Sequence, residues 1–268
     1  MANNNPIGIF DSGVGGLSVL GEVKKLLPNE SFIYFGDNAN VPYGEKTKEQ
    51  LVGFSRNILN YFASRNVKMV LMACNTSSAV TLDEIKSEYG FPVLGLIEPT
   101  ACFVADISDV NIGVIATSAT IKSNAYKEKI LKYAPEKTIF QTPCPGLVEL
   151  VEEEKTHSDE AKRLVAQYVL PLLDSKVTKL VLGCTHYPFL SDVILDVAQK
   201  EDFLINPAQY LAKEAYATLD SSVGFCDKTD GQVEFFTSKD PNEFVSVGQK
   251  LYPKVDKASL LELNNVIL

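Results

Sequence analysis

Two cysteines lie in similar local sequences 110 residues apart, and a cysteine thiol can accept a proton and return it. Cys74 follows the apolar run Val70–Met72 and a small residue, and Cys184 follows Leu180–Leu182 and a small residue. A short apolar run of this kind is typical of a buried strand in a parallel sheet. Open α/β sheets bind their ligands just beyond the carboxyl ends of such strands. We therefore expect both thiols at ligand-binding edges.

A second pair of similar segments has nearly the same offset. Ile7–Ser12 resembles Ile112–Thr117, which lies 105 residues later. Two repeats with nearly the same offset predict two similar lobes, each of which offers one thiol. A lone cysteine at a strand end is more often a packing residue. The pairing, and the helix amides that favour a thiolate at a strand-to-helix junction, point instead to chemistry: a proton leaves one face of a carbon and another arrives on the opposite face.

The elements that would position the thiols alternate along the chain. Strand patterns cover Ile7–Phe10, Phe32–Phe35, Met69–Met72, Val93–Leu96, Ile112–Ala116, Thr138–Gln141, Leu180–Leu182, Phe203–Ile205 and Val233–Thr237. Helical spacing covers Leu17–Leu27, Glu49–Arg65, Ser77–Tyr89, Ile121–Tyr133, Asp159–Leu173, Phe189–Gln199 and Pro241–Leu251. This alternation predicts an α/β fold of two pseudo-symmetric lobes, each a mainly parallel sheet flanked by helices. The repeats place the crossings between lobes near residues 98 and 207, so that residues 98–207 form the second lobe. We expect residues 208–268 to return to the first lobe with residues 1–97, although no sequence pattern shows this return, and the active site to lie in the cleft between the lobes.

The amino-acid composition is that of an ordinary globular enzyme. The 268 residues are 46% hydrophobic and 22% charged, and no apolar run is long enough to span a membrane. A net charge of −9 without a basic cluster argues against nucleic acid and anionic lipid as partners. Five cysteines without disulfide-scaffold spacing, and no leader pattern at the start, predict reduced thiols in the cytoplasm.

The glycine-rich segment Asp11–Gly16 allows two interpretations. A dinucleotide-binding loop would need a third glycine at Ser18, and Asp11 would repel a pyrophosphate. The segment is better interpreted as a tight turn whose backbone amides approach a small carboxylate. A turn without any ligand is the plainer alternative.

The remaining candidates surround the second thiol. His186 is two residues from Cys184, but no further histidine or cysteine cluster completes a zinc site, so we expect no metal. A Cys-His nucleophile stays open, although it leaves Cys74 unexplained. One of the glutamates at 152–154 can point into the cleft, although such a run is usually a solvated face. The segment Thr117–Thr120 can be an ordinary helix cap or can bind a carboxylate.

Four motifs in order resemble those of bacterial glutamate racemases. They are Ile7–Leu17, Val41–Gly44, Ala73–Thr76 and Leu182–Pro188, and a weaker match continues through Phe236–Pro241. The resemblance implies two pseudo-symmetric α/β lobes, no cofactor, and a supply of D-glutamate for peptidoglycan.

The resemblance also implies roles for individual residues. Cys74 and Cys184 correspond to the two proton-transferring thiols, and Asp11, Glu152 and His186 to their supporting acid-base groups. The implied substrate contacts are Asp11, Ser12, Tyr43, Gly44, Asn75, Thr76, Thr117, Thr120, Thr185 and His186. The expected partner is a small molecule, L- or D-glutamate, and a homodimer is one assembly that the sequence allows.

Three alternatives remain at this point. The first is a racemase of another acidic amino acid such as aspartate. The second is a thiol hydrolase that uses only Cys184 and His186. The third is a two-lobed binding protein without catalysis.

Overall fold

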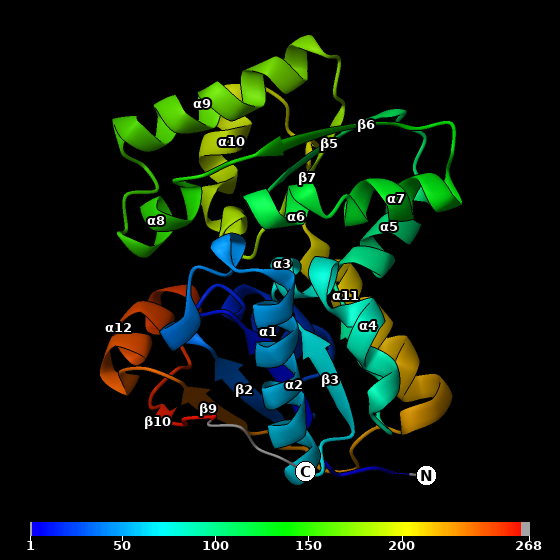
Figure 1. Ribbon diagram of the computed structural model, residues 1–268, viewed down its shortest axis with the longest axis vertical. Helices are drawn as coiled ribbons and strands as arrows, with labels where there is room; N and C mark the ends of the chain where they lie inside the picture. The colour runs from blue at the N-terminus through cyan, green and yellow to red at the C-terminus, as the bar shows by residue number, and fades with distance from the viewer. Residues whose placement is uncertain (1, 264–268) are drawn as a thin grey trace.

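The computed structural model describes residues 2–263, and its strands form two parallel sheets (Figure 1). The larger sheet has the order β10-β9-β2-β1-β3-β4. Its strands are β1 (Ile7–Asp11), β2 (Phe32–Gly36), β3 (Met69–Met72), β4 (Val93–Gly95), β9 (Val233–Thr237) and β10 (Ser259–Leu260). Because β9 pairs with β2, the chain returns to the first sheet after it has built the second.

The smaller sheet has the order β6-β5-β7-β8, and all of its strand pairs are parallel. Its strands are β5 (Asn111–Ala116), β6 (Thr138–Pro143), β7 (Lys179–Gly183) and β8 (Leu204–Ile205). β1, β2 and β3 are buried along their whole length, as parallel strands covered on both faces must be. The predicted fold class is confirmed. The exact lobe boundaries stay a prediction, although the strands divide between the sheets in the same way.

Helices cover both sheets. The α-helices are α1 (Leu17–Leu26), α2 (Lys48–Ser64), α3 (Asn75–Val80), α4 (Leu82–Ile85), α5 (Ile97–Asp106), α6 (Ser118–Lys122), α7 (Ala125–Tyr133), α8 (Leu147–Glu152), α9 (Asp159–Asp174), α10 (Ser191–Ala198), α11 (Pro207–Thr218) and α12 (Pro241–Leu251). Shorter helical turns cover Asn38–Asn40, Tyr43–Glu45, Lys86–Glu88, Tyr187–Leu190 and Leu219–Val223. Within residues 2–263, no helix has the length and hydropathy that crossing a membrane requires.

Two predicted helices are divided in the structure. The segment 77–89 is interrupted at Thr81, whose hydroxyl donates to the Ser77 carbonyl and competes with the helical ladder. The segment 121–133 is divided by Asn124, which has a φ of 56° and so ends one helix before the next begins. Helices α5, α8 and α11 were not predicted. For α11 a signal was present, because Asn206 caps the helix and Pro207 occupies its first position.

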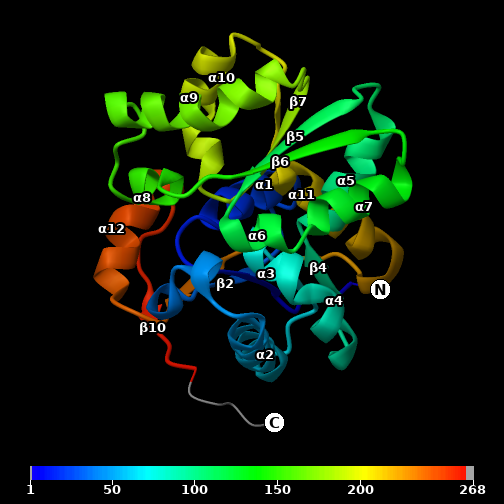
Figure 2. The same cartoon turned by 45° about the horizontal axis from the view of Figure 1, so that its top comes forward.

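The strand register brings the predicted motifs together at one edge of each sheet. In the larger sheet Phe10 aligns with Met72, so Asp11 and Cys74 follow neighbouring strands. In the smaller sheet Ala116 aligns with Gly183, so Thr117 lies beside Cys184. The two sheets are stacked with these edges toward each other (Figure 1), and the views agree that α8 of one sheet lies near α12 of the other (Figure 2).

Candidate active site

A cavity of about 280 Å³ is lined by both thiols, at the carboxyl ends of β3 and β7. Eleven of the thirteen predicted site residues line it: Ser12, Tyr43, Gly44, Cys74, Asn75, Thr76, Thr117, Glu152, Cys184, Thr185 and His186. The other two, Asp11 and Thr120, are buried behind these lining residues. The lining comes from both sheets, so a bound molecule would touch both halves of the structure.

Cys74 caps the amino terminus of α3. Its sulfur accepts a hydrogen bond from the Ser77 amide at 3.5 Å and lies 3.9 Å from the Ser12 hydroxyl. Burial, followed by the nearby negative charge of Asp11, raises the pKa of Cys74 to about 11, and the Ser77 hydrogen bonds oppose this only in part. At neutral pH Cys74 is therefore a protonated thiol that can donate a proton.

Cys184 has a different environment. Its sulfur lies 3.8 Å from Nδ1 of His186, whose Nε2 lies 3.2 Å from Oε1 of Glu152. Burial alone would lower the pKa of His186, but the interactions with Cys184 and Glu152 outweigh it and raise that pKa to about 10. The hydrogen bond from His186 lowers the pKa of Glu152. Glu152, His186 and Cys184 thus form a chain of carboxylate, imidazolium and sulfur. A neighbouring imidazolium stabilises a thiolate.

Asp11 is fully buried at the end of β1. Its Oδ2 accepts hydrogen bonds from the amides of Gly13 at 3.1 Å and Gly16 at 2.9 Å. Within residues 2–263 its Oδ1 has no hydrogen-bond partner. Burial raises the pKa of Asp11, and the charge of His186 acts in the opposite direction. Gly16 must be a glycine here, since a Cβ would lie 2.5 Å from the Cβ of Asp11.

Three threonine hydroxyls join the two sheet edges at the cavity. The Thr76 hydroxyl lies 3.0 Å from that of Thr117 and 3.4 Å from that of Thr120. Thr117 also accepts a hydrogen bond from the Thr120 amide and so caps α6. The helix-cap interpretation and the ligand-contact interpretation of this segment are therefore compatible, because one hydroxyl can do both.

Asp37 fixes the part of the cavity wall that Tyr43 and Gly44 form. Its carboxylate accepts hydrogen bonds from the Tyr43 hydroxyl at 2.6 Å, from Nδ2 of Asn40 and from the Ser238 hydroxyl. This network fixes the turn that carries Tyr43 and Gly44. No lysine or arginine is among the described residues that line the cavity. An anionic ligand would accordingly be bound by hydroxyls and amides.

The sequence left open which glutamate faces the cleft. Glu152 lines the cavity, whereas Glu153 points to solvent and pairs with Lys155 at 2.6 Å. Three further residues of the site were not predicted: Ser77, Tyr126 and Cys144. Cys144 lines the cavity, and its sulfur donates to the Thr142 carbonyl at 3.5 Å. For Ser77 a signal existed, since the third residue after a helix cap has a free amide.

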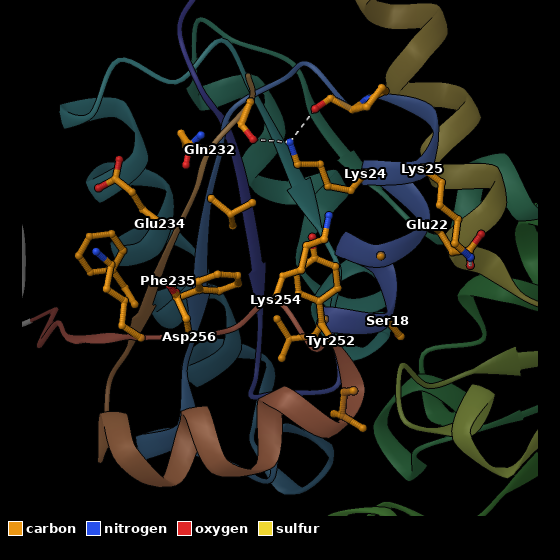
Figure 3. A pocket seen from close by; sticks show the side chains of 18 of the residues that line it. Ser18, Glu22, Lys24, Lys25, Gln232, Glu234, Phe235, Tyr252, Lys254 and Asp256 are labelled. Carbon is orange, nitrogen blue, oxygen red and sulfur yellow. Dashed lines mark hydrogen bonds and ion pairs between the residues drawn. The ribbon is translucent and has the colours of Figure 1, made fainter. Parts of the chain in front are cut away.

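A larger cavity, of about 1210 Å³, lies elsewhere, between α1 and the chain around residues 229–236 and 251–259 (Figure 3). None of the predicted site residues lines it. Its best-placed cation, Lys24, already donates to the carbonyls of Pro28, Glu30 and Gly231. Lysine and carboxylate side chains line it in equal numbers. In the described part of the chain, no group of three or more His, Cys, Asp or Glu residues is arranged to hold a metal ion.

Comparisons with known proteins show which family and which solved structures the chain resembles. The model of the Asp/Glu/Hydantoin racemase family matches residues 15–215. A glutamate racemase from Picosynechococcus sp. is 39% identical over 264 residues, which are 98% of this chain and 94% of that protein. The structure of glutamate racemase from Francisella tularensis in complex with D-glutamate matches with a TM-score of 0.91 and 32% identity, over 97% of this chain and 98% of that one. The structure of the Thermus thermophilus enzyme in complex with β-chloro-D-alanine matches with a TM-score of 0.87 and 33% identity, over 98% and 99%.

Proposed function

The chain belongs to the Asp/Glu/Hydantoin racemase family, and we propose that it interconverts L-glutamate and D-glutamate with Cys74 and Cys184 as its two bases. The reaction itself follows from near full-length similarity to glutamate racemases and makes the chain an isomerase. One observation carries the assignment of the bases: two thiols from different sheets line one small cavity. Neither aspartate as the substrate nor a hydrolase with a single thiol is favoured, and a hydrolase leaves Cys74 without a role.

The two thiols start the reaction in different protonation states. In the L-to-D direction the Cys184 thiolate, paired with the His186 imidazolium, takes the proton from Cα. The Cys74 thiol, with its pKa raised to about 11, gives its proton to the opposite face. Afterwards Cys184 is the thiol and Cys74 the thiolate, and the D-to-L direction runs the same steps in reverse. The assignment of L-glutamate to Cys184 and of D-glutamate to Cys74 is the one that the resemblance to glutamate racemases implies.

The Cα proton of an amino acid is a very weak acid, so the site must stabilise the carbanion that forms. Hydrogen-bond donors fixed in advance are effective in a cleft from which water is excluded. Hydroxyls of Ser12, Thr76, Thr117 and Thr185 line the cavity and can bind the two carboxylates of glutamate. Asp11 and Glu152 supply the negative charge near Cys74 and His186 that sets the acid-base balance.

The biological role of the product, the cellular compartment and the oligomeric state are part of the same proposal. The product D-glutamate would enter peptidoglycan, and the reduced cysteines suit a cytoplasmic enzyme. The homodimer stays a prediction, which light scattering after size-exclusion chromatography would test.

The test is exchange of the Cα proton of glutamate in deuterated water. Purified protein without pyridoxal phosphate should place deuterium at Cα of both enantiomers and lead to a racemic mixture. Cys74→Ala and Cys184→Ala should each abolish net racemisation, because the leaving and the arriving proton need both groups. Full racemase activity in either variant, or activity lost when a carbonyl cofactor is removed, would contradict the proposal.

A further inference from the structure

Tyr126 touches both segments that carry the thiols. It lies on α7 and is 1% exposed. Its hydroxyl donates a hydrogen bond of 2.6 Å to Oδ1 of Asn75, the residue after Cys74. Its ring packs on Gly183, the residue before Cys184, so closely that a Cβ there would lie 3.3 Å from the ring. One side chain thus spans from the smaller sheet to the first turn of α3.

The hydrogen bond determines which way the Asn75 amide faces. Burial, followed by the negative charge of Cys184, raises the pKa of Tyr126, so the hydroxyl keeps its proton and needs an acceptor. Oδ1 of Asn75 accepts the hydrogen bond of the Tyr126 hydroxyl, and the nearby Thr100 hydroxyl donates its own proton to the Leu96 carbonyl. A flipped amide would present N–H groups to the Tyr126 hydroxyl and lose this short hydrogen bond.

The other side of the amide is then free for a ligand. Asn75 lines the cavity, and within residues 2–263 its Nδ2 has no hydrogen-bond partner. An amide is planar, so with Oδ1 held by Tyr126 the Nδ2 group points away from that hydroxyl.

We propose that Tyr126 is a positioning residue for substrate binding, which holds the Asn75 amide so that its N–H donors face a carboxylate of the substrate. This inference rests on the proposed function for the identity of that substrate. Without the Tyr126 hydroxyl the amide can rotate and turn Oδ1 toward the carboxylate. A cavity without lysine or arginine depends on each neutral donor, so this loss weakens binding in both directions of the reaction.

The test is Tyr126→Phe, which removes only the hydroxyl. A hydrogen bond to a charged group is worth about 10- to 100-fold in binding, so we expect KM for both enantiomers to rise by about that factor. The turnover number should change much less, because the thiols and His186 are untouched. The matched control is Tyr89→Phe, since the Tyr89 hydroxyl also donates to an asparagine Oδ1, that of Asn60 at 2.9 Å, away from the cavity. Tyr89→Phe should leave KM unchanged.

A double mutant separates positioning from packing. Asn75→Ala should raise KM by itself, and in that background Tyr126→Phe should add little, because the hydroxyl acts only through the amide. An unchanged KM in Tyr126→Phe, or independent effects that multiply in the double mutant, would overturn the proposal. A wild-type protein that does not racemise glutamate would instead refute the proposed function, so the two failures are distinguishable.

Discussion

From the ion pair between Glu152 and His186 we predict how Glu152→Gln changes the pH dependence of turnover. The amide keeps the shape of the side chain but removes the negative charge that lies 3.2 Å from Nε2 of His186. The raised pKa of His186 keeps the imidazolium from acidic pH up to about 10, and this form is lost as the pH rises through that value. Glu152→Gln lowers the pKa of His186. The alkaline limb of turnover with L-glutamate must therefore move to lower pH.

The size of the effect follows from the distance and the exposure. At 3.2 Å two unit charges attract by about 1 kcal/mol at a dielectric constant of 80 and about 5 kcal/mol at 20. The Glu152 side chain is 40% exposed, so solvent screening places the interaction toward the lower figure. A loss of about 1.4 kcal/mol corresponds to one pH unit and to a tenfold effect. We expect the alkaline limb to move by about one unit and turnover at high pH to fall about tenfold.

The assay is the pH dependence of turnover, measured separately from each enantiomer. The two enantiomers have equal free energies, so kcat/KM must stay equal in the two directions in every variant. A difference between the two directions can therefore appear in kcat and in KM separately, while any change in kcat/KM must be the same in both directions. Glu153→Gln is the matched control, because the neighbouring carboxylate pairs with Lys155 outside the cavity. A pH profile of Glu152→Gln that superimposes on that of the wild type would refute the electrostatic reasoning.

Three further predictions concern other parts of the molecule. With the enantiomers of β-chloroalanine, Cys74→Ser should eliminate chloride from the L form and Cys184→Ser from the D form, which chloride release measures; the same preference in both variants would contradict the opposed thiols. Asp11→Asn should lower kcat about 100-fold with little change in KM, as expected of a group that supports proton transfer; steady-state kinetics in which only KM rises would make it a binding residue. The buried ion pair of Lys68 and Glu30 spans 2.7 Å, and Lys68→Met should lower the free energy of unfolding by about 3–5 kcal/mol in urea titrations. The double variant Lys68→Met with Glu30→Leu should recover most of that loss, because it also removes the carboxylate that Lys68→Met leaves buried without a partner. If stability does not recover, the unpaired Glu30 carboxylate is not the cause of the loss.

The sequence predicted the strands well because their residues are buried on both faces. β3 appears at the predicted Met69–Met72, and most other strands agree within two residues at each end. The helices were harder where a local conformation competes with the helical pattern. Apolar spacing runs through Asn124 without a break, yet the left-handed backbone at that residue ends one helix and starts another. Periodicity carries no information about such a single backbone angle.

The site was predictable to the extent that its residues follow strands. Cys74 and Cys184 could be paired from the sequence, since carboxyl ends of parallel strands meet at one edge. Positioning residues, which act on the substrate only through another side chain, could not be predicted from the places where strands end. Tyr126 lies within a helix, 51 positions from Asn75, and nothing in its own neighbourhood marks the hydrogen bond between them. Such a contact follows only from how the two sheets are placed.

The two thiols are related by a repeated fold but differ in their electrostatic surroundings. Cys74 lies near the buried negative charge of Asp11, and Cys184 lies beside the imidazolium of His186. This difference favours a pair with one thiolate and one thiol, and that pair can remove one proton and supply another. The equilibrium constant stays at unity because L- and D-glutamate are mirror images, whatever the surroundings of the thiols. In the proposed mechanism, pseudo-symmetry places the sulfurs on opposite faces of one carbon, and Asp11, His186 and Glu152 decide which sulfur begins as the base.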